Sequence, residues 1–120
     1  MFNQESAVFQ QLASRIADDI VSGTYQPDTA VPSANEYAQF YQMNPATASK
    51  SINLLVELGA LYKKRGVGMF VAENARETLL AQRRKDFRSE YLVPLLREAR
   101  IIGMSVKEIS EMIELEENAR

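Results

Sequence analysis

The sequence of 120 residues contains no cysteine and no histidine. The missing thiols exclude disulfides and thiol catalysis, and the missing imidazoles exclude every catalytic triad that depends on histidine. Structural zinc sites of the usual kind use the same two residue types, so we expect no metal. Only carboxylates remain for acid–base chemistry, and the notable pair, Asp18-Asp19, is best explained as solvated side chains beside a helix stripe. We therefore predict neither enzymatic activity nor a cofactor.

Long apolar runs and an excess of positive charge are also missing. No stretch of about 18 apolar residues is present to span a membrane, and the first residues lack the parts of a signal peptide. We therefore expect a cytoplasmic protein without membrane contact. The formal net charge is −2 and the pI is about 5.2, which argues against a general nucleic-acid coat protein. A sequence-specific DNA-binding protein remains compatible, because the position of the basic residues matters more than their sum.

Apolar spacing and capping residues predict three helices in the first half of the chain. The first is expected over about residues 5–22. A connector with two prolines follows, and a serine–x–x–glutamate capping box at Ser33 then starts a short second helix that ends by Met43. Asn44, followed by proline, starts a third helix over about residues 45–58.

Two short strands are predicted next, over residues 60–64 and 69–72. The segment that joins them contains two glycines, which is typical of a hairpin with a flexible tip. Helix, helix, tight turn, helix and hairpin is the order of a winged helix-turn-helix. We therefore predict a mainly α-helical fold with a small β-hairpin wing, in which residues 1–72 bind DNA.

The third helix has an apolar face, formed by Ala48, Ile52 and Leu55, and an opposite polar face. The polar face has small residues, two polar groups and one cation. It suits the major groove of DNA, where asparagine can pair with adenine and lysine can reach guanine or phosphate. The alternative is an amphipathic helix with an ordinary solvated face. The predicted contacts are Ala46, Ser49, Lys50 and Asn53, with Thr47 to the side near phosphate.

Two flanking features strengthen the DNA-binding hypothesis. Basic residues, Lys63-Lys64-Arg65, lie where the hairpin turns, and Gly66 and Gly68 let the backbone approach a phosphate or a narrow minor groove. Ser33 precedes a helix N-terminus whose free N–H groups can bind a phosphate. The ordinary explanations are a basic exposed turn and a simple helix cap.

Residues 73–120 form a predicted helical dimerisation arm of two helices. The first, over residues 75–102, would be about 42 Å long, and Pro94 must kink or interrupt it. A capping box at Ser105 starts the second, whose acidic tail we expect to fray. A small winged helix cannot cover the apolar stripe of this arm, so we predict a homodimer, with folding back onto the chain's own domain as the alternative. The predicted interface residues are Leu80, Phe87, Tyr91, Leu95, Ile102, Ile109 and Ile113.

The order and spacing of six stretches carry a family resemblance: Val8-Phe9-Gln10-Gln11-Leu12, Gly23 with Pro27, Val31-Pro32-Ser33, Met43-Asn44-Pro45-Ala46-Thr47-Ala48, Leu55-Val56-Glu57-Leu58-Gly59-Ala60-Leu61 and Arg65-Gly66-Val67-Gly68-Met69-Phe70-Val71. Residues 8–72 thereby resemble the DNA-binding domain of the GntR family, and the short helical tail resembles that of its YtrA-type subfamily. The resemblance implies a regulator that binds operator DNA as a dimer. By match, its DNA contacts are Ser33, Asn44, Ala46, Thr47, Lys50 and Gly66.

Three positions depart from the family pattern. Asn35 stands where the family usually has an arginine that contacts DNA, so the base preference of relatives should not be copied to this chain. Asp28 replaces a frequent glycine and tolerates a left-handed backbone better than most residues. Met69 replaces the usual threonine of the wing, which removes one hydroxyl contact. We include Asn35, Lys64 and Arg65 among the predicted DNA contacts.

The sequence therefore predicts a transcription regulator, a repressor that acts as a homodimer on an inverted-repeat operator. The alternative is a winged-helix protein-interaction module without DNA binding. The tail is too short for a separate effector domain, so any small-molecule effector is expected at the dimer interface.

Overall fold

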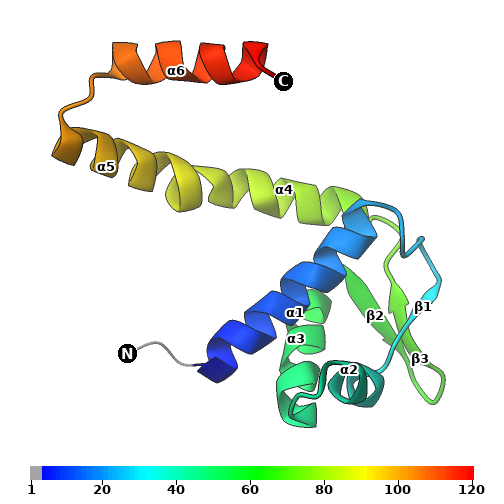
Figure 1. Cartoon of the computed structure of the whole chain (residues 1–120). Helices are drawn as coiled ribbons and strands as arrows, with labels where there is room; N and C mark the ends of the chain where they lie inside the picture. The colour runs from blue at the N-terminus through cyan, green and yellow to red at the C-terminus, as the bar shows by residue number, and fades with distance from the viewer. Residues whose placement is uncertain (1–3) are drawn as a thin grey trace. The chain divides into compact units, whose positions relative to one another are not determined.

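The computed structural model describes residues 4–120, with side chains from residue 8 onward, and divides the chain into two compact units (Figure 1). We call the part that ends at Gln82 the first unit and residues 83–120 the second unit. The predicted fold class, mainly α-helical with a small β wing, is confirmed.

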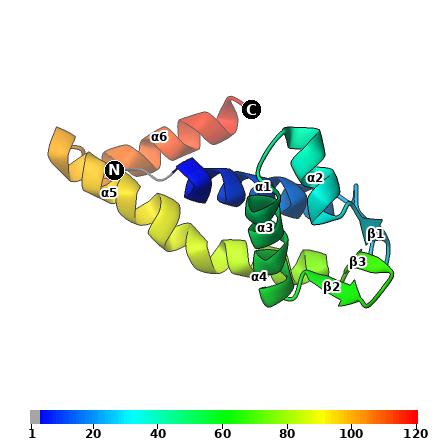
Figure 2. The same ribbon diagram turned by 90° about the horizontal axis from the view of Figure 1, so that it is seen from below.

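Three helices make up most of the first unit: α1 (Gln4–Val21), α2 (Ala34–Tyr41) and α3 (Pro45–Glu57). The helix starts follow the predicted caps, because Ser33 and Asn44 are the N-caps of α2 and α3. α3 packs against both α1 and α2 (Figure 2). These two helices therefore fix the position of α3 and of its polar face.

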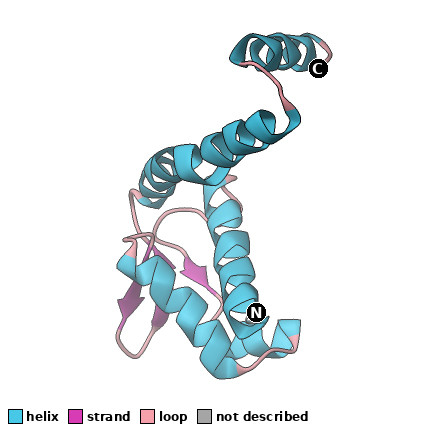
Figure 3. Cartoon of the chain, turned by 90° about the vertical axis from the view of Figure 1, so that its left-hand side faces the viewer, coloured by secondary structure: helices cyan, strands magenta, loops and turns pink. Residues whose placement is uncertain are grey.

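The wing is a three-stranded antiparallel sheet in the order β1-β3-β2. Its strands are drawn in magenta in Figure 3. Its strands are β1 (Ala30–Val31), β2 (Leu61–Lys64) and β3 (Gly68–Val71). The hairpin of β2 and β3 was predicted, but β1 was not: two residues inside a proline-containing connector are too short to show an alternating pattern. β1 pairs Ala30 with Phe70 and Val31 with Met69. It thus ties the connector before α2 to the wing.

The core of the first unit is formed by the apolar faces of its helices and strands, and it continues into α4 (Ala75–Phe87). Ala75 and Leu79 of α4 are almost fully buried in it. For this reason the first compact unit extends to Gln82, past the predicted boundary at residue 72.

The second unit contains the end of α4, the π-helix η1 (Arg88–Leu92), α5 (Val93–Ile102) and α6 (Val106–Asn118). Pro94 lies at the start of α5, so the predicted interruption takes the form of π-helical turns just before it. α6 begins at the predicted capping box of Ser105 and Glu108. The acidic tail does not fray as expected: α6 continues to Asn118, and beyond it Arg120 pairs with Glu117 at 2.8 Å.

Within residues 4–120, no helix has both the length and the apolar character that crossing a membrane requires. The same residues contain no group of three or more acidic side chains placed to hold a metal ion.

Candidate nucleic-acid interface

The apolar face of α3 is buried as predicted, and a hydroxyl that the sequence did not single out secures it. Ala48, Ile52 and Leu55 lie in the core. Ser51 is fully buried beside them, and its Oγ lies 2.8 Å from the carbonyl oxygen of Phe9 in α1 and 3.1 Å from that of Thr47. A buried hydroxyl without a partner would be costly, so this contact fixes α3 against α1.

The opposite face of α3 forms one continuous surface. A hollow of about 650 Å³ is lined by four of the predicted DNA contacts, Ala46, Ser49, Lys50 and Asn53, together with other neighbours. Thr47 is half-buried at the side of this face. The structure therefore brings these side chains together on one face of α3, as the helix wheel predicted. Their contact with DNA stays a prediction.

Lys50 is the cation of this surface, and an aromatic ring holds it in place. Its Nζ lies 4.7 Å from the centre of the Phe9 ring, a distance at which a cation is attracted to the face of the ring. Glu57 lies at the same hollow and brings negative charge to it. The positive charge of the surface is thus local and positioned by α1.

The N-termini of α2 and α3 are both capped by residues that the sequence predicts at the DNA. The Ser33 backbone N–H donates to Glu36 Oε1 at 3.0 Å, and the Glu36 N–H donates to Ser33 Oγ at 3.1 Å. Hydrogen bonding from Ser33, first from its backbone N–H and then from its side chain, holds the pKa of the Glu36 carboxyl below its usual value. Asn44 Oδ1 accepts from the Ala46 N–H at 2.8 Å. Ser33, Asn44 and the nearby Asn35 are all exposed, so the caps leave them accessible.

The wing presents Lys64, Arg65 and Gly66 to solvent at its turn. Gly66 has a φ of 76°, which a side chain would disfavour. The Lys64 Nζ lies 4.3 Å from the centre of the Phe70 ring and 5.9 Å from that of Tyr62. The ammonium group is therefore held over the sheet, whereas Arg65 lies in the turn itself.

Asp28 links the connector to the wing, a role that its sequence position alone did not reveal. Its backbone has a φ of 61°, in agreement with the expected left-handed conformation. Its N–H donates to the Val71 carbonyl at 2.8 Å, and its Oδ1 accepts from the Tyr62 hydroxyl at 2.9 Å. The second hydrogen bond raises the pKa of Tyr62.

The predicted dimerisation residues are mostly exposed. Phe87, Tyr91, Leu95, Ile102 and Ile113 are exposed, whereas Leu80 and Ile109 are half-buried. In the second unit only Ala99 is buried, so this unit has almost no apolar core of its own. Further exposed apolar side chains, which the sequence prediction did not include, are Leu92, Ile101, Val106, Met112 and Leu115.

Comparison with known proteins places these features in a family. Residues 9–71 match the family model described as bacterial regulatory proteins, gntR family. The chain belongs to the gntR family. The predicted family resemblance is thereby confirmed, and the chain is a transcription regulator with a DNA-binding domain.

Curated relatives differ in how much of them this gntR-family chain spans. It is 27% identical over 106 residues to the transcriptional repressor YtrA of Bacillus subtilis, which covers 88% of the chain and 81% of YtrA. It is 32% identical over 73 residues to the repressor NagR of the same organism, but spans only 30% of NagR. The likeness to YtrA therefore extends into the C-terminal helices, as the resemblance to the YtrA-type subfamily predicted.

Solved structures agree with the fold. A putative GntR-family transcriptional regulator from Bacteroides thetaiotaomicron has a TM-score of 0.76 and 33% identity, over 94% of this chain and 99% of that chain. The DNA-binding domain of AraR in complex with operator ORR3 has a TM-score of 0.52 and 36% identity, over 53% of this chain and 77% of that chain. Among these relatives, the AraR domain is one that binds operator DNA directly.

Proposed function

We propose that this gntR-family protein is a repressor that binds an inverted-repeat operator as a homodimer. The observation that carries the proposal is the exposed surface of α3, on which Ser49, Lys50 and Asn53 surround one hollow. The likeness to an operator-bound AraR domain supports it. Because its target is chromosomal DNA, we place the protein in the cytoplasm.

The side chains suggest a division of tasks on the DNA. Lys50 and Asn53 have the donors and acceptors that base edges in the major groove require, and Ala46 is small enough to permit close approach. Ser33 and Thr47 are suited to phosphate, which positions the protein without reading sequence. The wing turn, with its exposed glycine, fits the adjacent minor groove. The proposed contacts are Ser33, Asn35, Asn44, Ala46, Thr47, Ser49, Lys50, Asn53, Lys64, Arg65 and Gly66.

Dimerisation through the second unit follows from its exposed apolar side chains. An apolar surface of this kind is unfavourable in water, and a twofold dimer is the commonest way to cover it. Two linked DNA-binding units also gain effective concentration, which compensates for the few cations on each. Such a dimer reads half-sites about one helical turn, roughly 34 Å, apart, and it represses by occluding the promoter. A small-molecule effector at the dimer interface stays a prediction.

A mobility-shift titration with DNA from upstream of the protein's own gene tests the proposal. We expect specific retardation that weakens steeply as salt rises, because phosphate contacts release counterions. The double variant Thr47→Ala/Lys50→Ala abolishes the retardation while its thermal unfolding stays unchanged. Absence of retardation at micromolar protein overturns the proposal and favours a protein-interaction module.

A further inference from the structure

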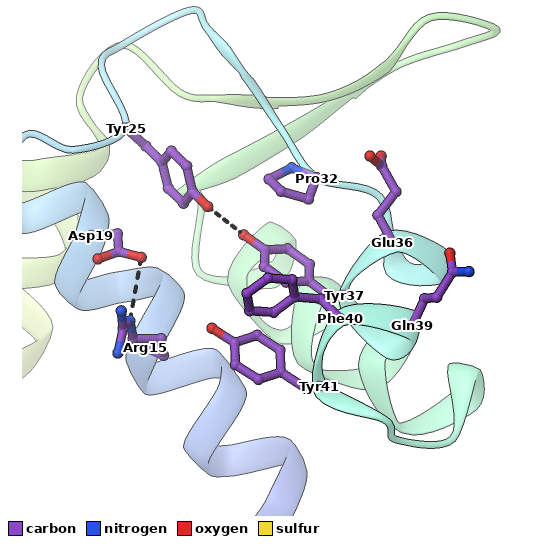
Figure 4. Close-up of a pocket in the computed structure, with 9 residues that line it drawn as sticks. All are labelled: Arg15, Asp19, Tyr25, Pro32, Glu36, Tyr37, Gln39, Phe40 and Tyr41. Atoms are coloured by element: carbon purple, nitrogen blue, oxygen red, sulfur yellow. Dashed lines mark hydrogen bonds and ion pairs between the residues drawn. The ribbon is translucent and has the colours of Figure 1, made fainter.

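The first unit contains a cavity on the side of α2 that faces α1. Its volume is about 590 Å³, within the range typical of small-molecule sites. Figure 4 shows Arg15 and Asp19 of α1 on one side and the aromatic side chains of α2 on the other, with Tyr25 and Pro32 of the connector above them. None of the predicted DNA contacts is among its lining residues.

The aromatic side chains that line the cavity are held in place by contacts with one another. Tyr37 is buried, and its hydroxyl lies 3.0 Å from that of Tyr25. The rings of Tyr37 and Tyr41 are stacked with centres 6.3 Å apart, and Phe40 meets Tyr41 edge-to-face at 4.9 Å. Phe40 is nevertheless 78% exposed. A large apolar ring left open at the rim of a cavity gains from any flat group that covers it.

The charges around this wall favour a cation. The lining contains one basic residue, Arg15, and two acidic residues, Asp19 and Glu36, which gives a formal sum of −1. Arg15 pairs with Asp19 at 3.6 Å, so these two charges offset each other. The carboxylate of Glu36 is then the remaining charge of the lining. Glu36, like any exposed carboxyl, is ionised at neutral pH, and the hydrogen bonds from Ser33 lower its pKa further. Aromatic faces attract cations, so the rings and Glu36 act in the same direction.

We propose that the cavity between α1 and α2 is a binding site for a small aromatic amine, with the ring against Phe40 and Tyr41 and the ammonium group near Glu36. The site lies wholly within the first unit. It therefore needs no second copy of the chain, unlike an effector site at the dimer interface.

A ligand bound in the cavity affects the proposed DNA surface through Glu36. The same carboxylate accepts the hydrogen bond from the Ser33 N–H. An ammonium group near Glu36 competes for that oxygen and loosens the capping box at the start of α2. This consequence rests on the proposed function, because Ser33 is one of the proposed phosphate contacts. The amine therefore weakens DNA binding.

The binding site is tested on the full chain without DNA by amide NMR, with three probes that share a phenyl ring. These are 2-phenylethylamine as the cation, 2-phenylethanol as the neutral form and phenylacetate as the anion. We expect the amine to shift signals around α2 and the facing side of α1, with an affinity about fivefold above that of the alcohol. Equal or tighter binding of the alcohol or the anion overturns the assigned class, and shifts scattered outside the cavity overturn the site.

Two variants and a control sharpen the test. Phe40→Ala removes an exposed ring, and Glu36→Gln removes the charge while glutamine can still close the capping box. Each lowers the amine affinity about fivefold. Val67→Ala, at an exposed wing position outside the cavity, leaves it unchanged. Unchanged affinity in both Phe40→Ala and Glu36→Gln overturns the site.

A separate titration of DNA, with and without saturating 2-phenylethylamine, tests the coupling. Weaker DNA binding with the amine supports it, and unchanged DNA binding overturns it. If the protein binds no DNA at all, the proposed function fails, whereas the NMR result on the cavity stands on its own.

Discussion

At the scale of single residues, Lys50 supplies the cation of the proposed DNA-reading surface of α3. Its ammonium group is the cation of the exposed α3 surface and is held over the Phe9 ring. We expect Lys50→Ala to weaken operator binding by about 1–3 kcal/mol, because a base or phosphate contact is lost. Lys107→Ala removes the same charge from α6 and is the matched control. A fluorescence anisotropy titration checks both, and equal losses in the two variants would contradict the assignment.

The capping box of α2 gives a pH-dependent prediction. Hydrogen bonds from the Ser33 backbone and side chain hold the pKa of Glu36 below its usual value of 4.5. Because the pKa is lowered in the folded state, Glu36 contributes stability above that usual value and loses it as the pH falls through the folded pKa. An NMR titration of the Glu36 carboxyl carbon should give a pKa below 4.5.

Removing the Ser33 hydroxyl tests the smaller, side-chain cause of this shift, because the backbone N–H remains. We expect Ser33→Ala to raise the pKa of Glu36 towards its usual value, whereas Ser110→Ala in α6 leaves it unchanged. A Glu36 pKa that is the same in the Ser33→Ala variant and in the original protein would show that the hydroxyl has no part in the shift.

Some residue roles could be predicted from the sequence and others could not. The caps Ser33, Asn44 and Ser105 have spacing signatures, because a cap acts on a neighbour two or three residues away. Ser51 and Asp28 have partners 42 and 34 residues away, so no local pattern announces them. No local pattern marks Phe40 either. Its exposure at a cavity depends on how α3 places α2 relative to α1.

At the scale of elements, the attachment of α3 to α1 depends on a buried hydroxyl. Ser51 donates to the Phe9 carbonyl at 2.8 Å. We expect Ser51→Ala to lower the free energy of unfolding by about 1 kcal/mol, since the hydrogen bond is lost and a small void remains. Chemical denaturation measures this loss.

Ser49, two residues earlier on the same helix, provides the matched control. It faces the proposed DNA surface, so Ser49→Ala should change the unfolding free energy by less than about 0.5 kcal/mol while weakening DNA binding. The reverse pattern, with Ser49→Ala destabilising and Ser51→Ala neutral, would contradict the orientation of α3.

The elements themselves were predictable where the signal was local. Helical periodicity together with caps located α1, α2, α3 and α6, and Pro94 indicated the break before α5. β1 was not predicted, because its two residues gain their strand conformation only by pairing with β3. The prediction for the end of α6 was also wrong. A tail of like charges suggested fraying, whereas the helix continues to Asn118.

At the scale of the whole molecule, the second unit is expected to hold two copies of the chain together. It exposes Phe87, Tyr91, Leu95 and Ile102 and buries almost nothing. We expect a solution mass of twice the 13.6 kDa of one chain. Leu95→Glu should return it to the single-chain mass, because a charge in an apolar interface is costly. Sedimentation equilibrium gives both masses.

Arg97→Glu is the control for this substitution, because position 97 lies on the opposite side of α5 from Leu95 by helical periodicity. It places a glutamate on the same helix, with an even larger change of charge because an arginine is removed, and should leave the dimer intact. A single-chain mass for the unaltered protein would refute the dimer.

The division of the molecule was only partly visible in the sequence. The change of character after the wing was clear, but Ala75 and Leu79 are buried in the first unit. The sequence does not indicate whether these apolar side chains pack in the first unit or in the second. Their burial in the first unit is why the compact unit extends to Gln82, whereas the assignment of residues 1–72 as the DNA-binding domain stays a prediction.

Hydroxyl-radical footprinting of the full chain on DNA from upstream of its gene tests the central claim most directly. We predict two protected segments of related, inverted sequence, centred about one helical turn apart and weakened with Lys50→Ala. Uniform cleavage at micromolar protein, or protection that Lys50→Ala leaves unchanged, would contradict it.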